Sequence, residues 1–167
     1  SRAAAALHFD AYVGRVRKRL GALAGRVKTG FNNVLVDSYE AGSQNWTQGF
    51  ERTFAARKEY SLVPWLPVLA GHVIGSMADS ERFLEDYRRV IADLFAENYA
   101  GEMARKCHEA GLRLSLEGYG SCPADNLQYG RFADIPMGEF WSGPGTGVSG
   151  VGNARFPAYL AHVWGQR

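Results

Sequence analysis

The segment Val34-Leu35-Val36-Asp37-Ser38-Tyr39-Glu40-Ala41-Gly42-Ser43-Gln44-Asn45-Trp46-Thr47 determines the fold expected of this chain. It begins as an apolar run rich in β-branched residues, which is typical of a strand buried on both faces of a parallel sheet. The run then changes abruptly to acids, amides and a tryptophan. Polar clusters at the C-terminal ends of parallel strands are where α/β folds carry their sites. The segment predicts a strand over residues 32–38 followed by a functional loop.

The polar residues of this segment also have a purely structural interpretation. The side chains of Asp37 and Ser38 are typical caps of a turn, because they bond to the nearby backbone. What favours a site is the density of polar and aromatic residues after the strand. The residues concerned are Asp37, Glu40, Gln44, Asn45 and Trp46.

Two later segments repeat the same arrangement. Residues 112–117 form an apolar run that ends in Glu117-Gly118-Tyr119-Gly120, and residues 135–141 form a short run that ends in Glu139-Phe140-Trp141. Helical patterns lie around these strands, at residues 7–24, 47–58, 79–111, 125–128 and 154–164. Alternating strands and helices indicate a parallel sheet with right-handed crossovers. We therefore expect an α/β fold, a partial (β/α)8 barrel of the TIM type, because a complete barrel needs about 250 residues.

The longest expected helix lies between Asp79 and Gly111. Apolar residues trace one continuous stripe along it, which predicts a core-facing side, and Gly111 is a typical C-terminal residue. Asp79 or Ser80 is expected to cap its start. The charged residues Glu81, Arg82, Glu85 and Arg88 are expected to form its solvated face. Before this helix, the prolines of residues 62–69 exclude a regular central strand and predict short helical turns.

The composition limits the classes of function. A hydrophobic content of 46% with 22% charged residues is that of a soluble globular protein, and the net charge of +2 gives no reason to expect nucleic acid. No apolar run reaches membrane-spanning length. Cys107 and Cys122 lack metal-type spacing, and Cys107 is expected in the core. We expect residues 1–167 to belong to a single catalytic domain, with no second domain within the chain.

Three strands would each deliver a glutamate, Glu40, Glu117 and Glu139, to the same edge of the sheet. Converging carboxylates are what glycoside hydrolysis requires, since one acid protonates the leaving oxygen and a second activates water or attacks the sugar. Asn and Gln side chains form hydrogen bonds with sugar hydroxyls, and aromatic rings stack on the apolar faces of sugar rings. The same carboxylates would suit a hard cation such as calcium. The structural alternative is that single glutamates pair with Arg113 or Arg131.

Several motifs together resemble the barrel domain of glycoside hydrolase family 106, whose members are α-L-rhamnosidases. The motifs are Asp37 to Thr47, Leu66-Pro67-Val68-Leu69 with Gly71, Ser80-Glu81-Arg82-Phe83-Leu84, Ala92-Asp93-Leu94 with Glu97-Asn98-Tyr99, Glu117-Gly118-Tyr119-Gly120, and Asp134 to Trp141. The resemblance covers nearly the whole chain. It implies an inverting reaction that removes terminal rhamnose from glycans or glycosides, in a multi-domain enzyme that uses calcium.

The resemblance also implies roles for the residues. Glu40 matches the position of a general acid, and Glu139 matches an active-site glutamate that could hold metal or sugar. Glu117 is expected to orient sugar hydroxyls or to bind calcium, so that Glu117 and Glu139 are the candidate metal ligands. The remaining expected contacts to the sugar are Asp37, Gln44, Asn45, Trp46, Tyr119 and Trp141.

The chain departs from the family in its length. Ala161-His162-Val163-Trp164-Gly165 resembles the end of a helix that precedes a further barrel strand with another acidic motif. We therefore expect a fragment, with other strands and accessory domains outside it, and with either Glu139 or that further acid as the second catalytic carboxylate. Two other interpretations stay open. One is a different carboxylate-dependent glycosidase or metal hydrolase on a partial barrel, and the other is a non-catalytic carbohydrate-binding module.

Overall fold

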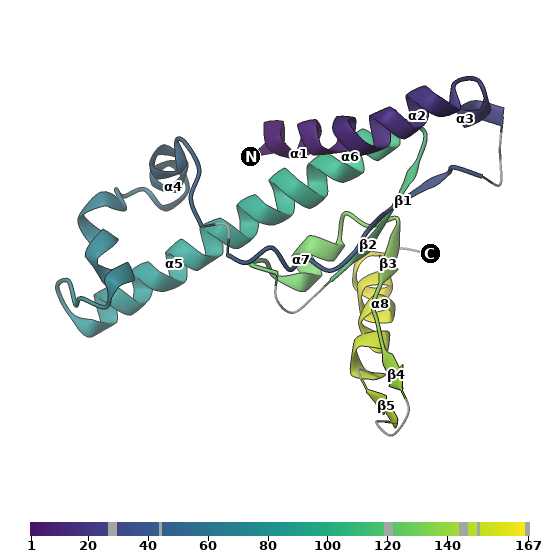
Figure 1. The fold of residues 1–167 in the computed structure, drawn as a ribbon. Helices are drawn as coiled ribbons and strands as arrows, with labels where there is room; N and C mark the ends of the chain where they lie inside the picture. The colour runs from purple at the N-terminus through teal and green to yellow at the C-terminus, as the bar shows by residue number, and fades with distance from the viewer. Residues whose placement is uncertain (27–29, 44, 119–121, 144–146, 150, 166–167) are drawn as a thin grey trace.

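The computed structural model describes residues 1–26, 30–43, 45–118, 122–143, 147–149 and 151–165 (Figure 1). Its centre is a parallel sheet of three strands, β1 (Asn33–Val36), β2 (Arg113–Glu117) and β3 (Ile135–Met137), in the order β1-β2-β3. In register, Val36 lies opposite Leu116, and Leu116 lies opposite Pro136. The expected parallel order of three strands is confirmed. Pro136 is tolerated because β3 is an edge strand of the described sheet.

The third strand is shorter than expected. It ends at Met137, and Trp141 instead begins a separate antiparallel pair, β4 (Trp141–Gly143) with β5 (Gly147–Ser149). The sequence analysis did not anticipate this hairpin. Its glycine-rich sequence lacks the alternation of apolar and polar residues that identifies a half-buried strand.

The first helical region begins earlier than residue 7. It comprises α1 (Arg2–Phe9), a π-helical turn η1 (Asp10–Gly14), α2 (Arg15–Leu20) and a short α3 (Leu23–Arg26). The Ser1 hydroxyl accepts a bond from the Ala4 N–H, which caps the start. Gly21, with φ of +53°, ends α2, so the single helical pattern expected over residues 7–24 is divided into shorter helices.

The second helix, α4 (Phe50–Lys58), begins after Gly49 and not at Thr47. It is followed by η2 (Val63–Ala70), a 3₁₀ helix, which agrees with the short helical turns expected there. Further along the chain, the short helix expected at residues 125–128 is α7 (Asn126–Gly130), which is capped by Asp125, and α8 (Val151–Trp164) starts before residue 154.

The long helical region is continuous, as its apolar stripe predicts. It consists of α5 (Met77–Phe95), a π-helical turn η3 (Ala96–Ala100) and α6 (Gly101–Glu109). Its cap is Ser76, in a reciprocal pair with Asp79, whereas Ser80 instead bonds the backbone of Ile74. Gly111, with φ of +70°, follows its end. In Figure 1 the α6 end of this helix lies beside the sheet, with α1 along α6, and α4 lies near the other end of the helix.

Two hydrophobic clusters lie along this helix. One joins α6 to the sheet and includes Val34, Leu114, Cys107 and Tyr129. The other lies between α4, η2 and the first half of α5, and is built mainly from aromatic residues. Its buried members are Phe50, Phe54, Leu62, Val68, Phe83, Tyr87 and Val90. The apolar stripe of the long helix therefore contributes residues to both clusters. Cys107 is buried as expected, and Cys107 and Cys122 are both free thiols.

The expectation that β1 is buried on both faces is wrong for this chain. Val34 and Val36 are buried, but Leu35 between them is 56% exposed. Successive side chains of a strand point to opposite faces. One face of β1 therefore packs into the cluster with α6, while the described residues leave the other face open at Leu35. The three described strands do not close into a barrel. No helix in the described ranges is long and apolar enough to cross a membrane.

Candidate functional site

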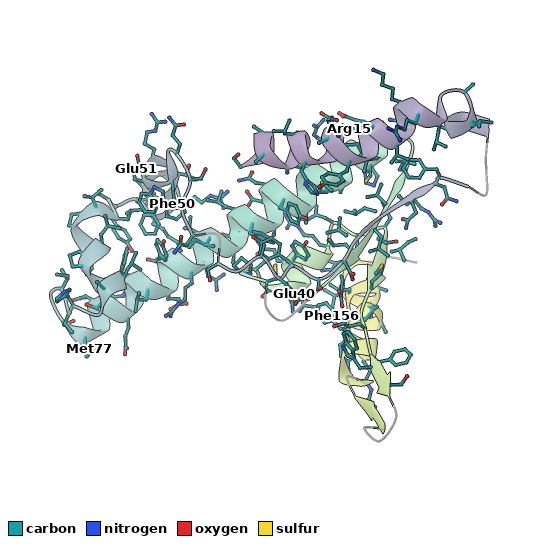
Figure 2. All side chains as sticks on the ribbon, viewed as in Figure 1. Arg15, Glu40, Phe50, Glu51, Met77 and Phe156 are labelled. Carbon is teal, nitrogen blue, oxygen red and sulfur yellow. The ribbon has the colours of Figure 1, made fainter. Side chains whose placement is uncertain are left out.

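Carboxylates gather at the C-terminal edge of the sheet. Val36 and Leu116 pair in register, so Asp37 and Glu117 follow side by side at the ends of β1 and β2. Glu139 lies just beyond β3 and is half-buried, whereas Glu117 is only 2% exposed. Figure 2 shows Glu40 in the loop that continues from β1. The parallel order of the strands therefore brings Asp37, Glu117 and Glu139 to one edge, while Glu40 lies further along the loop after β1.

Glu117 has the most perturbed electrostatics of these acids. Burial raises the pKa of its carboxyl to about 7, and the nearby charge of Glu139 adds to this rise. A hydrogen bond to Asp37 and the charge of Asp37 raise the pKa further, while the Ser38 N–H opposes the rise by donating to the carboxylate. Glu117 Oε2 is buried and has no hydrogen-bond partner among the described residues. A carboxyl that changes charge near neutral pH, with one free buried oxygen, is typical of a functional position.

Gly118 explains how α8 reaches this edge. A Cβ atom at Gly118 would lie 2.2 Å from Cε1 of Phe156, so the ring of Phe156 occupies the space that a side chain would fill. The glycine directly after Glu117 therefore permits the close approach of α8.

Glu40 lies in a different environment. Its Oε1 accepts a hydrogen bond from the Ser38 hydroxyl at 2.6 Å, and its side chain is exposed. The position of Glu40 in the sequence, after an apolar strand and near Tyr39 and Trp46, predicts a partly desolvated acid. The structure corrects that environment, because the loop leaves the sheet and no described element covers Glu40.

The loop that carries Glu40 is held to the long helix at both ends. Near its start, the Tyr39 ring packs edge-on against Phe95, with centroids 4.6 Å apart. Near its end, the Tyr87 hydroxyl donates to the backbone carbonyl of Asn45 at 2.9 Å. Trp46 packs on Phe50 at 5.2 Å and is 50% exposed. The sequence analysis missed the anchoring role of Tyr87, and the only available signal was a hydroxyl within an otherwise apolar stripe.

The other sequence-predicted residues are placed as follows. Trp141 is 64% exposed at the start of β4, and the Asn45 side chain is exposed. Gln44 and Tyr119 lie outside the described residues. No ion pair between described residues includes Glu40, Glu117 or Glu139, so pairing with Arg113 or Arg131 does not account for these acids.

The fit of a metal ion to these residues is partial. A buried carboxylate oxygen without a partner is a suitable ligand for a hard cation. Within the described ranges, however, no group of three or more acids, histidines or cysteines is close enough to hold a metal ion. Glu117 and Glu139 could supply only part of a coordination sphere.

Comparison with known proteins shows which protein family this chain is related to. The profile of glycoside hydrolase family 106, described as alpha-L-rhamnosidase, matches residues 1–167. The chain belongs to glycoside hydrolase family 106. The structure of the rhamnosidase from Novosphingobium sp. PP1Y is similar over 99% of this chain, with a TM-score of 0.86 and 32% sequence identity. A curated protein of Formosa agariphila, named "Putative beta-glucuronidase", is 44% identical over 152 residues, or 91% of this chain.

The family 106 chain spans only a small part of these relatives. It covers 16% of the Novosphingobium rhamnosidase chain and 13% of the length of the Formosa protein. The family membership that the motifs suggested is confirmed.

Proposed function

We propose that this chain is part of the catalytic domain of an α-L-rhamnosidase that removes terminal rhamnose from glycans or glycosides. The observation that carries the proposal is the position of Glu117 beside Asp37 and near Glu139 at one edge of a parallel sheet. Family 106 membership adds the substrate class. In this proposal the three strands are part of a (β/α)8 barrel whose remaining strands belong to the longer enzyme.

The proposed mechanism is an inverting acid–base hydrolysis. Glu40 is the general acid that protonates the leaving oxygen, and the partner carboxylate is Glu139 or an acid of a further strand. An inverting enzyme needs a separation of about 6.5–9.5 Å between its two carboxyl groups, so that a water fits between the base and the sugar. The proposed sugar contacts are the exposed rings of Trp46 and Trp141, together with Asp37, Gln44, Asn45, Glu117 and Tyr119.

Calcium is the proposed cofactor, held by Glu117 and Glu139 with further ligands from the longer protein. The unpartnered Oε2 of Glu117 supports this assignment, because calcium prefers carboxylate oxygens. When bound, the cation would supply a fixed positive charge for sugar hydroxyl oxygens. The protein residues orient the sugar and move the proton.

A β-glucuronidase is the second candidate, because the relative from Formosa agariphila carries that name at 44% identity. The test uses the full-length protein with p-nitrophenyl α-L-rhamnoside and p-nitrophenyl β-D-glucuronide. Release of p-nitrophenol from the rhamnoside supports the proposal, and release from the glucuronide alone supports the second candidate. Binding of rhamnose without hydrolysis of either substrate would overturn both in favour of a binding module.

The stereochemistry of the product tests the inverting mechanism separately. Proton NMR of the first minutes of hydrolysis should show the β-anomer of rhamnose before mutarotation. Initial release of the α-anomer would contradict inversion.

A further inference from the structure

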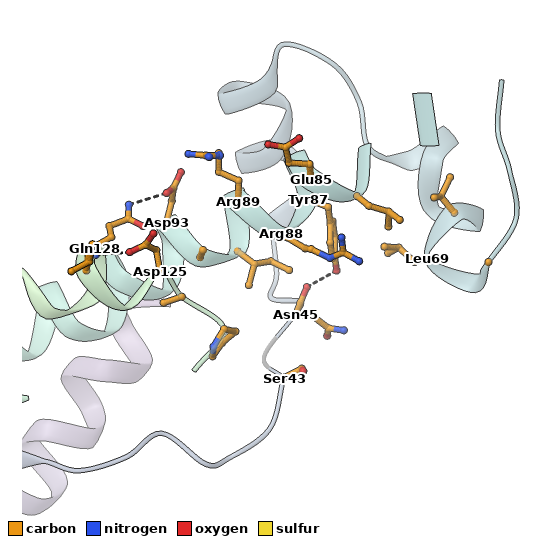
Figure 3. Close-up of a pocket in the computed structure, with 18 of the residues that line it drawn as sticks. Ser43, Asn45, Leu69, Glu85, Tyr87, Arg88, Arg89, Asp93, Asp125 and Gln128 are labelled. Carbon is orange, nitrogen blue, oxygen red and sulfur yellow. Dashed lines mark hydrogen bonds between the residues drawn. The ribbon is translucent and has the colours of Figure 1, made fainter. Parts of the chain in front are cut away.

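A large cavity lies beside the loop after β1 and along α5, and Asp37, Glu40, Glu117 and Glu139 are not among the residues that line it. Its volume is about 1160 Å³, which is comparable to the upper end of ligand pockets in proteins. Figure 3 shows two of its walls, the loop through Ser43 and Asn45 and the segment through Asp125 and Gln128, at different positions along α5. One wall follows β1 and the other follows β2, so the cavity is built from the loops at the C-terminal edge of the sheet.

The walls of the cavity are tied to α5 by hydrogen bonds. The Tyr87 hydroxyl donates to the Asn45 carbonyl at 2.9 Å, and the Gln128 Nε2 donates to Asp93 at 2.8 Å (Figure 3). The cavity is therefore a defined feature of the fold, with both walls fixed to one helix.

The charged residues that line the cavity are three acids, Glu85, Asp93 and Asp125, and two arginines, Arg88 and Arg89. Asp93 accepts from Gln128 and pairs with Arg57 at 3.6 Å, and Asp125 caps α7. Neither Arg88 nor Arg89 takes part in an ion pair with a described residue.

The directions of the side chains separate the two arginines. In Figure 3 the Arg88 side chain extends toward the part of the cavity where Tyr87 meets Asn45. Glu85 and Arg89 point to another side of α5, where the spacing of four residues lets their opposite charges offset each other. Arg88 is thus a cation beside the loop wall without an acidic partner among the described residues.

We propose that this cavity binds an acidic sugar unit, a uronate, on the leaving-group side of the glycan, with Arg88 recognising its carboxylate. The guanidinium group presents paired donors that match a carboxylate. The exposed Asn45 amide and the Ser43 hydroxyl beside it suit sugar hydroxyls. The inference rests on the proposed function in placing a glycan at this edge of the sheet, and it assigns Arg88 a role in specificity.

The experiment measures binding to the full-length protein by NMR titration, with methyl β-D-glucuronide, its methyl ester and methyl β-D-glucoside as probes. We expect the glucuronide to bind about tenfold more tightly than the two neutral probes, because only it carries the carboxylate. The variant Arg88→Gln should remove this preference, and Arg88→Lys should retain part of it, since it keeps the charge but loses the paired geometry.

Arg82→Gln is the matched control, because Arg82 is an exposed arginine of the same helix outside the cavity. It should leave all three affinities unchanged. Equal binding of the three probes to the wild type, or an unchanged preference in Arg88→Gln, would overturn the inference. Rhamnose serves as a separate ligand. Absence of rhamnose binding and hydrolysis in the wild type would contradict the proposed function, whereas the part of the glucuronide preference that Arg88→Gln removes reports on the cavity.

Discussion

Asp37 and Glu117 share a hydrogen bond at the ends of two parallel strands that are distant in the sequence. Two carboxyl groups can share such a bond only when one of them holds a proton. Glu117 is the buried member of the pair and Asp37 is the exposed one. Burial favours the neutral form, so the proton resides on Glu117. The edge of the sheet therefore contains a group whose charge depends on pH near neutrality.

The first prediction concerns stability against pH. Glu117 has a pKa of about 7 in the folded chain against an ordinary value of 4.5, so the folded state holds more protons than the unfolded state between these values. Stability should therefore fall as pH rises from about 4.5 to about 7, and the Glu117 contribution should be constant above that. The total loss is about 3 kcal/mol at most, and urea unfolding in EDTA at several pH values measures it.

Glu117→Gln is the variant that isolates this contribution. Its amide is close in shape to the carboxyl and does not titrate, so the variant should exceed the wild type in stability above pH 7 and approach it near pH 4.5. Equal pH profiles for the two proteins would show that Glu117 is not the group responsible.

The second prediction concerns calcium in the full-length protein. Ligand carboxylates must be deprotonated, so calcium affinity should rise as pH increases through about 7, the pKa of Glu117. Removal of calcium with EDTA should lower the melting temperature of the wild type. Glu117→Gln and Glu139→Gln should each reduce the difference in melting temperature between the calcium-loaded and EDTA-treated proteins. Glu85→Gln, on the exposed side of α5, should leave that difference unchanged. Calcium binding that does not vary between pH 5 and 8 would argue against Glu117 as a ligand.

The third prediction concerns the anchor of the loop. Tyr87→Phe removes the hydroxyl that donates to the Asn45 carbonyl but keeps the ring that packs on Phe50 and Phe83. The free energy of unfolding should fall by about 1 kcal/mol. The value of kcat should fall as well if the loop positions the acid Glu40. Tyr12→Phe is the control, since Tyr12 is 69% exposed on η1, and its effect should stay within about 0.5 kcal/mol.

The fourth prediction concerns the open face of β1. Leu35 is 56% exposed on a strand at the edge of the described sheet, and such a surface favours association with another copy. Sedimentation of the isolated 167-residue chain should show oligomers that Leu35→Thr reduces, because threonine keeps the strand propensity without the apolar side chain. Leu7→Gln, at a leucine of α1 that is 71% exposed, should leave the oligomers intact. A monomeric wild type would contradict the prediction.

The sequence predicts the features of this fold that depend on local patterns. The apolar runs before Asp37 and Glu117, and the shorter one before Glu139, identify the strands because strand and helix periods differ along the chain. The parallel order follows from the helices between the strands. Local signals are weaker at helix starts: Asp79 or Ser80 was the expected cap of the long helix, and the observed cap is Ser76. Such boundaries depend on one or two hydrogen bonds.

The rest depends on contacts between distant segments. Leu35 has the same apolar character as Val34 and Val36, and only the packing on each face shows that it is exposed. Arg88 was correctly expected on the solvated face of the long helix. Its place beside Asn45 could not be predicted, because it depends on the contact of Asn45 with Tyr87, which lies 42 residues away in the sequence. A single sequence shows which residues are present, but it does not show that these distant residues come together around one cavity.

The last prediction concerns the role of Glu40. In this chain Glu40 is exposed and bonded to Ser38, so the desolvation of a general acid would have to come from substrate or from the longer enzyme. Glu40→Gln in the full-length enzyme should slow rhamnosides with alkyl leaving groups by about 10²–10⁴-fold, the usual contribution of general acid catalysis. Aryl rhamnosides with good leaving groups need little protonation and should be slowed far less. Ser38→Ala is the companion variant, and it should change the alkaline limb of the pH–rate profile, where the general acid loses its proton, without removing activity. If Glu139→Gln shows the dependence on leaving group while Glu40→Gln slows both classes equally, the acid is Glu139 and the assignment is reversed.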